Sequence, residues 1–322
     1  MLNRFKSTAC IFTCLLLLAA GYLGYVVADI YFNLRASDEG GKDSQFSREI
    51  GDFYVPEEEK DIINTLLIGV DSKDGTGRSD TIMLVRYNPG NQMIGLVSIP
   101  RDTKMKLPER GREKVNHAHA YGGPNYLAKT IENFLEIPIH HYVKVNMEGF
   151  KNSIDILGGV ELKVEKDLYW STPDGTDVID LQAGKQVLDG DKALQYVRFR
   201  ADSEGDIGRV KRQQKLVKAT IDELLRFRSI TRVSSLLREA KDNVTMTYNF
   251  QDLVRYGTSF HKIQWSEMES QVLPGKSAMI NGVWYYVVEK AEAQESIRDV
   301  INKDIEQSES QPTGSRLEST GR

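Results

Sequence analysis

Cysteine is almost absent from this chain of 322 residues, which contains two, Cys10 and Cys14, within one apolar segment near the N-terminus. We expect both to pack inside a membrane, and they lie too early in the apolar run to be the modified cysteine of a lipoprotein. The remainder of the chain therefore has no cysteine for a disulfide, a thiol nucleophile or a zinc-thiolate site.

Two motifs that mark common enzyme classes are also missing. The sequence contains neither a G-x-S-x-G elbow nor a G-x-x-x-x-G-K-[ST] loop, so serine-hydrolase and P-loop ATPase functions lose their main support. The formal net charge of −4 argues against general binding to nucleic acid or to anionic lipids. Histidine is scarce, and the H-x-H pair of His117 and His119 has no cysteine to complete a zinc set.

One uncharged segment, residues 9–28, stands out from the otherwise mixed composition. About 20 apolar residues are enough to cross a bilayer as a helix. Arg4 and Lys6 precede the segment and Asp29 follows it, which places the N-terminus in the cytoplasm. A cleaved signal peptide is the alternative, but the apolar run is longer than usual and no clean small-x-small site follows it. We predict a single-pass protein of the cell membrane with its main domain extracytoplasmic.

The composition divides the chain into six parts. Residues 1–8 form the cytoplasmic N-terminus, residues 9–28 the transmembrane anchor, and residues 29–60 a polar extracytoplasmic linker. We expect the catalytic domain to occupy residues 61–240 and a less periodic C-terminal extension to occupy residues 241–305. The polar tail, residues 306–322, is predicted to be disordered.

Within the main domain, strands and helices alternate, which predicts an α/β sandwich around a mixed central sheet. Apolar runs predict strands at residues 63–71, 81–87, 93–100, 141–147 and 160–164. Helices are predicted at residues 124–136 and 148–159, from Asp189 to Tyr196, and from Asp206 or Gly208 to about Arg226.

The first candidate site follows the first strand, where Asp71, Arg78 and Asp80 flank a glycine-rich loop. Ligands of open α/β sheets bind where strands end. Two carboxylates at such an edge suit Mg²⁺, which leaves positions for phosphate and water. Simple ion pairing between Arg78 and the aspartates is the alternative.

A second candidate is Arg101, which follows the strand ending in Ile99-Pro100. It joins the same pocket if the neighbouring strand is parallel, whereas a local pair with Asp102 is the alternative.

The third candidate is an arginine-rich run that contains Arg198, Arg200, Arg209 and Arg212. The guanidinium group binds phosphate oxygens in a planar, bidentate manner, and a helix N-terminus adds N–H groups and partial positive charge. Gln213 falls within the apolar arc of the 208–226 helix, and Arg209 lies at its edge. Polar groups directed at a core need partners, and a phosphate or pyrophosphate is a suitable one. A solvated basic face explains Lys211, Lys215 and Lys218 instead.

The order and spacing of several motifs resemble the LytR-CpsA-Psr family of bacterial cell-envelope proteins. The resemblance covers roughly residues 62–226 and rests on LLIGVD with GRSDTIMLV, SIPRD, KVNHAHAYGG, GGVELKV, LDGDKALQYVRFR and GDIGRVKRQQ. His117 and His119 depart from the smaller or aromatic residues expected in that segment.

The resemblance implies an α/β/α sandwich with an apolar tunnel for a polyprenyl phosphate. It implies an enzyme that transfers a glycopolymer, such as a teichoic acid or capsular polysaccharide, from undecaprenyl pyrophosphate to peptidoglycan through a phosphodiester. It implies these roles: Asp71 and Asp80 bind Mg²⁺ (or Mn²⁺); Arg78, Arg101, Arg198, Arg200, Arg209, Arg212 and Gln213 bind the pyrophosphate; and Asp80, Asp71 and Arg101 act in catalysis.

Two other functions use much of the same site. A polyprenyl-pyrophosphate hydrolase would need the same residues and would differ only in its product. A non-catalytic regulator that binds a lipid phosphate would keep the arginines but would not need both aspartates. The aspartates therefore favour an enzyme, and the extracytoplasmic placement disfavours direct DNA binding.

Overall fold

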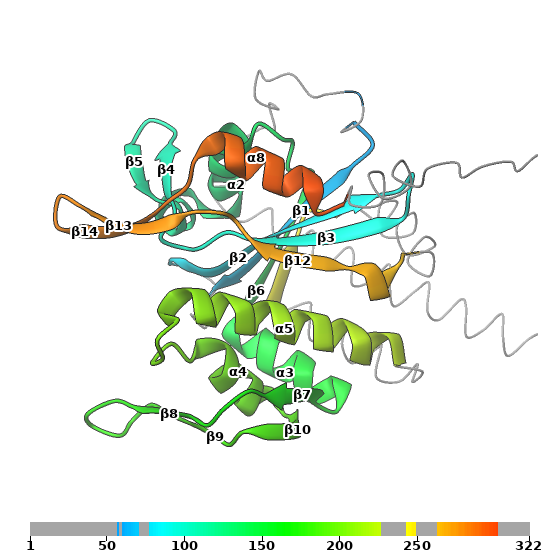
Figure 1. Ribbon diagram of the computed structural model, residues 1–322, viewed down its shortest axis with the longest axis vertical. Helices are drawn as coiled ribbons and strands as arrows, with labels where there is room; N and C mark the ends of the chain where they lie inside the picture. The colour runs from blue at the N-terminus through cyan, green and yellow to red at the C-terminus, as the bar shows by residue number, and fades with distance from the viewer. Residues whose placement is uncertain (1–56, 58–59, 71–76, 227–242, 249–262, 302–322) are drawn as a thin grey trace, which may run out of the picture.

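The computed structural model describes residues 57, 60–70, 77–226, 243–248 and 263–301. A six-stranded sheet forms the centre (Figure 1). Its strands, in spatial order, are β11 (Val244–Met246), β6 (His141–Asn146), β1 (Ile63–Val70), β2 (Ser79–Asn88), β3 (Met93–Ser98) and β12 (Glu269–Val272). The predicted anchor, the predicted tail and most of the predicted linker lie outside the described residues. No helix within the described ranges is long and apolar enough to span a membrane.

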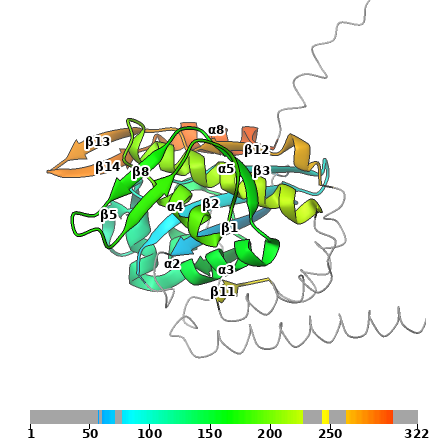
Figure 2. The same cartoon turned by 90° about the horizontal axis from the view of Figure 1, so that it is seen from below.

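Helices cover both faces of the sheet. They are α2 (Val115–Leu135), α3 (Met147–Leu157), α4 (Gly190–Arg198), α5 (Gly205–Arg226) and α8 (Lys290–Asp299), with a short 3-10 turn at Trp265–Glu267. Figures 1 and 2 show α2 and α8 on one face and α3, α4 and α5 on the other. Four two-stranded antiparallel sheets complete the fold: β4 (Lys104–Leu107) with β5 (Gly111–Lys114), β7 (Val160–Val164) with β10 (Gly184–Leu188), β8 (Leu168–Ser171) with β9 (Val178–Leu181), and β13 (Lys276–Ile280) with β14 (Val283–Val287).

The sheet is mixed, as predicted. Strand β1 runs parallel to β6 and antiparallel to β2, β2 is antiparallel to β3, and β3 is parallel to β12. The C-terminal ends of β1 and β3 therefore lie at the same end of the sheet, beside the beginning of β2. Asp80 and Arg101 are located at this end.

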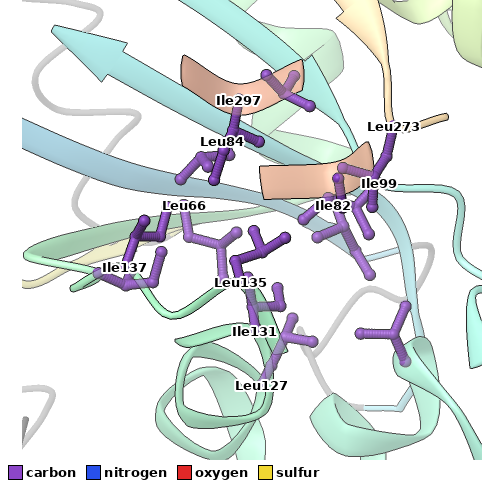
Figure 3. Close-up of a cluster of buried hydrophobic side chains, with 14 of the residues drawn as sticks. Leu66, Ile82, Leu84, Ile99, Leu127, Ile131, Leu135, Ile137, Leu273 and Ile297 are labelled. Carbon is purple, nitrogen blue, oxygen red and sulfur yellow. The ribbon is translucent and has the colours of Figure 1, made fainter. Parts of the chain in front are cut away.

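Two separate apolar cores stabilise the fold. In the first, Leu66 of β1 and Leu84 of β2 pack with Ile297 of α8 (Figure 3). Helix α2 contributes three buried side chains to this core, those of Leu127, Ile131 and Leu135. The second core joins α3, α4 and α5 to the β7–β10 and β8–β9 strand pairs, and it includes Tyr196, which is fully buried. No strand of the central sheet contributes to the second core, so the sheet face beneath these helices is not filled by it.

Helix α2 begins earlier than predicted. The expected helix at residues 124–136 is present, but α2 starts at Val115 and bends at Gly122 and Gly123, whose backbone angles are not helical. Pro124 opens the second half of the helix, in keeping with its preference for a first turn. Sequence analysis did not predict the first half of α2, because the two glycines interrupt the helical spacing of its apolar residues.

The segments after residue 240 belong to the same fold. Strand β12 forms one edge of the central sheet and β11 forms the other, while Ile297 of α8 and the adjacent Val300 are buried in the first core. The sequence ESQV of β12 has too little apolar character to predict a sheet strand. Its place in the sheet depends instead on parallel pairing with β3.

The side chain of Arg86 connects helix α8 to the sheet through hydrogen bonds. It is fully buried in β2, donates from Nε to Asn64 Oδ1 at 3.0 Å, and donates from Nη1 to the carbonyl oxygen of Ile297. A buried guanidinium of this kind satisfies two oxygens that have left water.

We predict that Arg86→Met lowers the free energy of unfolding by about 2 kcal/mol or more, because two buried oxygens lose a donor. Urea denaturation of the full chain in detergent measures the loss. The exposed Arg112 of β5 provides the control, and Arg112→Met should change stability by less than about 0.5 kcal/mol. Equal unfolding midpoints for the two variants would contradict this role for Arg86.

Candidate active site

A cavity of about 430 Å³ separates the sheet from the α3, α4 and α5 layer. Its walls are mainly apolar and come from the sheet and all three helices. They include Leu67, Met83, Val143, Val145, Met147, Phe150, Ile179, Leu194, Val197, Leu216 and Val217. Polar residues also line it, and they include Asp80, Arg101, Asp177, Arg198, Arg200, Arg209 and Gln213. The cavity therefore suits a ligand that combines a long apolar part with an anionic group.

The alternation of side chains along β1 explains the apolar wall. Leu66 belongs to the first core and is not among the cavity residues, whereas Leu67 and Gly69 are only half-buried and line the cavity. Ile68 is buried in the first core and also borders the cavity. Successive side chains of a strand point to opposite faces. Gly69 stands opposite Thr81 of β2, and a Cβ at Gly69 would lie 3.0 Å from the Thr81 Cβ. The glycine thus keeps this part of the wall open.

Asp80 and Arg101 meet at one edge of the sheet, where Arg101 donates from Nη1 to Asp80 Oδ1. We expected Arg101 to reach this pocket if the neighbouring strand were parallel. The neighbour of β3 that carries Asp80 is the antiparallel strand β2, whereas its other neighbour, β12, is parallel. The beginning of β2 lies beside the end of β3 in an antiparallel pair, so Asp80 and Arg101 meet without the parallel arrangement that we expected.

Asp206 links Arg101 to the helical layer. Its Oδ1 lies 2.7 Å from Arg209 Nη2 and 4.0 Å from Arg101 Nε. Sequence analysis identified Asp206 only as a candidate helix start and missed this role. The i, i+3 spacing of Asp206 and Arg209 was the available signal.

The environment acts differently on the two arginines. Burial lowers the pKa of Arg209, and the nearby Asp206 carboxylate opposes that effect. Burial also disfavours the charged form of Arg101, but its hydrogen bond to Asp80 and the charge of Asp206 leave its pKa raised. The buried Nε atoms of both arginines have no hydrogen-bond partner among the described residues. Buried donors of this kind are expected to find a partner, and an anionic ligand would supply one.

The other predicted ligands that line the cavity come from α4 and α5 and from the connection between them. Arg198 donates from Nη2 to Asp177 Oδ2 at 2.9 Å, and Arg200 is exposed. Gln213 is buried on α5. Four of the predicted arginines, at 101, 198, 200 and 209, therefore line one cavity together with Asp80 and Gln213.

Arg212 is placed differently. It does not line the cavity; it donates from Nη1 to Asp202 Oδ2 at 2.9 Å and from Nη2 to the carbonyl oxygen of Phe199 at 2.7 Å. The Arg212 and Asp202 side chains are 4% and 6% exposed, so the pair is almost completely buried. These contacts fix the connection between α4 and α5.

Arg78 does not lie among the cavity residues. Arg78 is exposed just before β2, and Asp71 falls outside the described residues. His119 Nδ1 is 2.7 Å from the carbonyl oxygen of Gly77, which positions the backbone next to Arg78. His117 pairs with Glu113 at 2.9 Å.

The polar residues fit a magnesium ion that shares its ligands with a substrate. Among the described residues, no group of three histidine, cysteine or acidic side chains could hold a metal ion. Mg²⁺ commonly takes one or two carboxylates and completes its shell with phosphate and water. The half-buried Asp80 carboxylate provides a ligand of this type beside the arginines.

Comparison with known proteins identifies the family. The LytR_cpsA_psr family model matches residues 27–301. The chain belongs to the LytR_cpsA_psr family. The match extends beyond the motifs at residues 62–226 and takes in β11, β12 and α8.

A curated relative from Oceanobacillus iheyensis is 36% identical over 258 residues, which are 78% of each chain. That relative is named polyisoprenyl-teichoic acid–peptidoglycan teichoic acid transferase TagU. Among solved structures, TagT bound to LIIa-WTA has a TM-score of 0.62 and 29% identity, and the match covers 77% of this chain and 92% of TagT. The family protein YwtF (TagT) with bound octaprenyl pyrophosphate lipid has a TM-score of 0.57 and 27% identity, with the same coverage.

Arg200 lines the cavity and Arg212 does not, so we predict that their substitution has different effects on stability. Arg212→Ala should lower the free energy of unfolding by about 3 kcal/mol, because the buried Asp202 carboxylate loses the guanidinium and keeps only the Lys166 ammonium at 3.2 Å. Arg200→Ala should change stability by less than about 0.5 kcal/mol, since its side chain is exposed. Thermal and urea denaturation of the two variants test this difference. Similar losses in both variants would show that the two arginines do not have separate roles.

Proposed function

We propose that this protein is a phosphotransferase that moves a glycopolymer from an undecaprenyl pyrophosphate carrier to peptidoglycan and forms a phosphodiester bond. The observation that carries the proposal is the cavity, in which apolar walls and four arginines adjoin. The names of the relatives favour a teichoic acid as the glycopolymer. We further propose that residues 9–28 anchor the protein in the cell membrane and that the catalytic domain is extracytoplasmic.

The apolar walls suit the polyprenyl chain of the donor. Leu67, Phe150 and Val197 come from the sheet, α3 and α4, so a chain between the layers would contact all three elements. Burial of apolar surface contributes about 25 cal/mol per Å². This contribution is independent of the sugar composition of the polymer, and it would hold the lipid while the polar end of the cavity holds the pyrophosphate.

The arginines would hold the pyrophosphate and stabilise the charge that develops on it. Arg101 and Arg209 are preorganised by Asp80 and Asp206 before any ligand binds. Preorganised cations stabilise phosphoryl-transfer transition states without reorganising during the reaction. Asp80, together with Asp71, would hold Mg²⁺ (or Mn²⁺), which when bound neutralises phosphate charge.

The proposed reaction exchanges one phosphorus–oxygen bond for another. A sugar hydroxyl of peptidoglycan attacks the phosphorus that carries the glycopolymer, and its oxygen forms the new bond. The bond from that phosphorus to the bridging oxygen breaks, and the lipid phosphate leaves with the bridging oxygen. The hydroxyl proton passes to a carboxylate, for which Asp80 and Asp71 are the candidates. The pyrophosphate supplies the driving energy, so the reaction needs no ATP.

The test uses the full chain in detergent with Mg²⁺, an undecaprenyl-pyrophosphate-linked glycan and peptidoglycan fragments. We expect mass spectrometry to detect the phosphodiester-linked product, and we expect Asp80→Ala and Arg101→Ala to abolish it while the variants stay folded. Free glycan phosphate without transfer product would indicate a hydrolase. Lipid binding without turnover would indicate a regulator, and either result would overturn the transferase proposal.

The lipid-binding role of the cavity can be tested separately. Val197→Trp should fill part of the apolar wall and weaken binding of undecaprenyl phosphate by roughly tenfold, a change of about 1.4 kcal/mol. Val187 of β10 is exposed, so Val187→Trp introduces the same side chain outside the cavity as a control. Calorimetry with detergent-solubilised lipid measures both affinities. Unchanged affinity in Val197→Trp would place the lipid elsewhere.

A further inference from the structure

We propose that the tip of the β13–β14 hairpin binds the acceptor glycan by stacking Trp284 against its sugar rings. This inference rests on the proposed transferase function and adds a binding site for the second substrate. The residues concerned are Met279, Val283 and Trp284, and none of them lines the cavity.

The hairpin exposes large apolar side chains at its tip. Trp284 is 58% exposed and Met279 is 57% exposed, and the two residues are cross-strand partners. Val283, beside them, is also exposed. A cluster of exposed apolar side chains is typical of an interaction site.

The tip has a defined conformation. Asn281 and Gly282 both have positive φ angles, of 51° and 78°, as in the tight two-residue turns that favour an Asn-Gly pair. Tyr285 lies beneath the ammonium groups of Lys104 and Lys114, which are 5.1 and 5.9 Å from the centre of its ring. These contacts hold the hairpin and leave Trp284 presented at its end.

The base of the hairpin is joined to the loop that carries Arg101. The Tyr286 N–H donates to the carbonyl oxygen of Asp102 at 2.9 Å, and Thr103 forms an isolated bridge with Tyr286. Two residues of strand, or about 7 Å, separate Trp284 from Tyr286. Figure 1 shows the hairpin projecting beyond the end of the sheet. The hairpin is therefore connected to the end of the site where the acceptor hydroxyl must arrive.

The chemistry of the tip favours a sugar ring as its occupant. Pyranose rings present flat faces of C–H groups, and the broad indole of Trp284 offers a complementary surface, while its N–H can bind a hydroxyl or an acetamido oxygen. The proposed reaction also requires a carbohydrate acceptor to meet the polar end of the cavity. A polymeric acceptor can reach the site and contact the hairpin at the same time.

Acceptor kinetics test the inference in the full chain. Trp284→Ala should raise the acceptor KM by roughly tenfold, or about 1.4 kcal/mol, and should leave the donor KM unchanged. Trp284→Phe should restore part of the loss, because it keeps an aromatic face. Val187→Ala, at an exposed site on β10, is the control and should change neither constant.

Direct binding separates failure of this inference from failure of the proposed function. Calorimetry with peptidoglycan glycan fragments should show weaker binding by Trp284→Ala even if no transfer occurs. Unchanged fragment affinity and acceptor KM would overturn the inference while leaving transferase activity intact. Loss of vesicle binding or of self-association in Trp284→Ala, with acceptor affinity unchanged, would instead assign the tip to a membrane or to a second copy and would also overturn it.

Discussion

The carboxylate of Asp206 connects the two layers that form the site. It lies near Arg101, which follows a strand of the sheet, and near Arg209, which belongs to α5. The Asp80 carboxylate completes the chain of charges by binding Arg101. These interactions join the sheet to the helical layer at one side of the cavity. Elsewhere the apolar cavity lies between the sheet and the helices. The separation provides space for a lipid, while the charges fix the groups that would bind its phosphates.

The strongest sequence signals predicted much of the central architecture. The apolar runs of β1, β2 and β3 identified the middle of the sheet, and Asp189 caps α4 as expected, with its carboxylate accepting from the Lys192 N–H at 2.9 Å. The beginning of α2 and the edge strand β12 were harder to identify. Paired glycines interrupt the first, and the second depends on pairing with a strand far away in the sequence.

The arginine run shows where sequence reasoning reaches its limit. Arg209 and Arg212 are three residues apart on one helix, and both are buried, yet only Arg209 lines the cavity. Periodicity places them on neighbouring parts of the helix surface but does not specify their partners. Arg212 binds Asp202 and the carbonyl oxygen of Phe199 away from the cavity, whereas Arg209 pairs with Asp206 beside Arg101. That difference arises from the path of the chain between α4 and α5.

The position of the two edge strands has a consequence for the order in which the protein is made. Strands β11 and β12 both follow α5 in the sequence, although they close opposite sides of the sheet. During synthesis, β6 and β3 therefore emerge long before the segments that cover their free edges. Unpaired strand edges are prone to association with other chains. The nascent sheet must remain protected until β12 and α8 have been synthesised, so the fold is completed only after the chain has grown past Asp299.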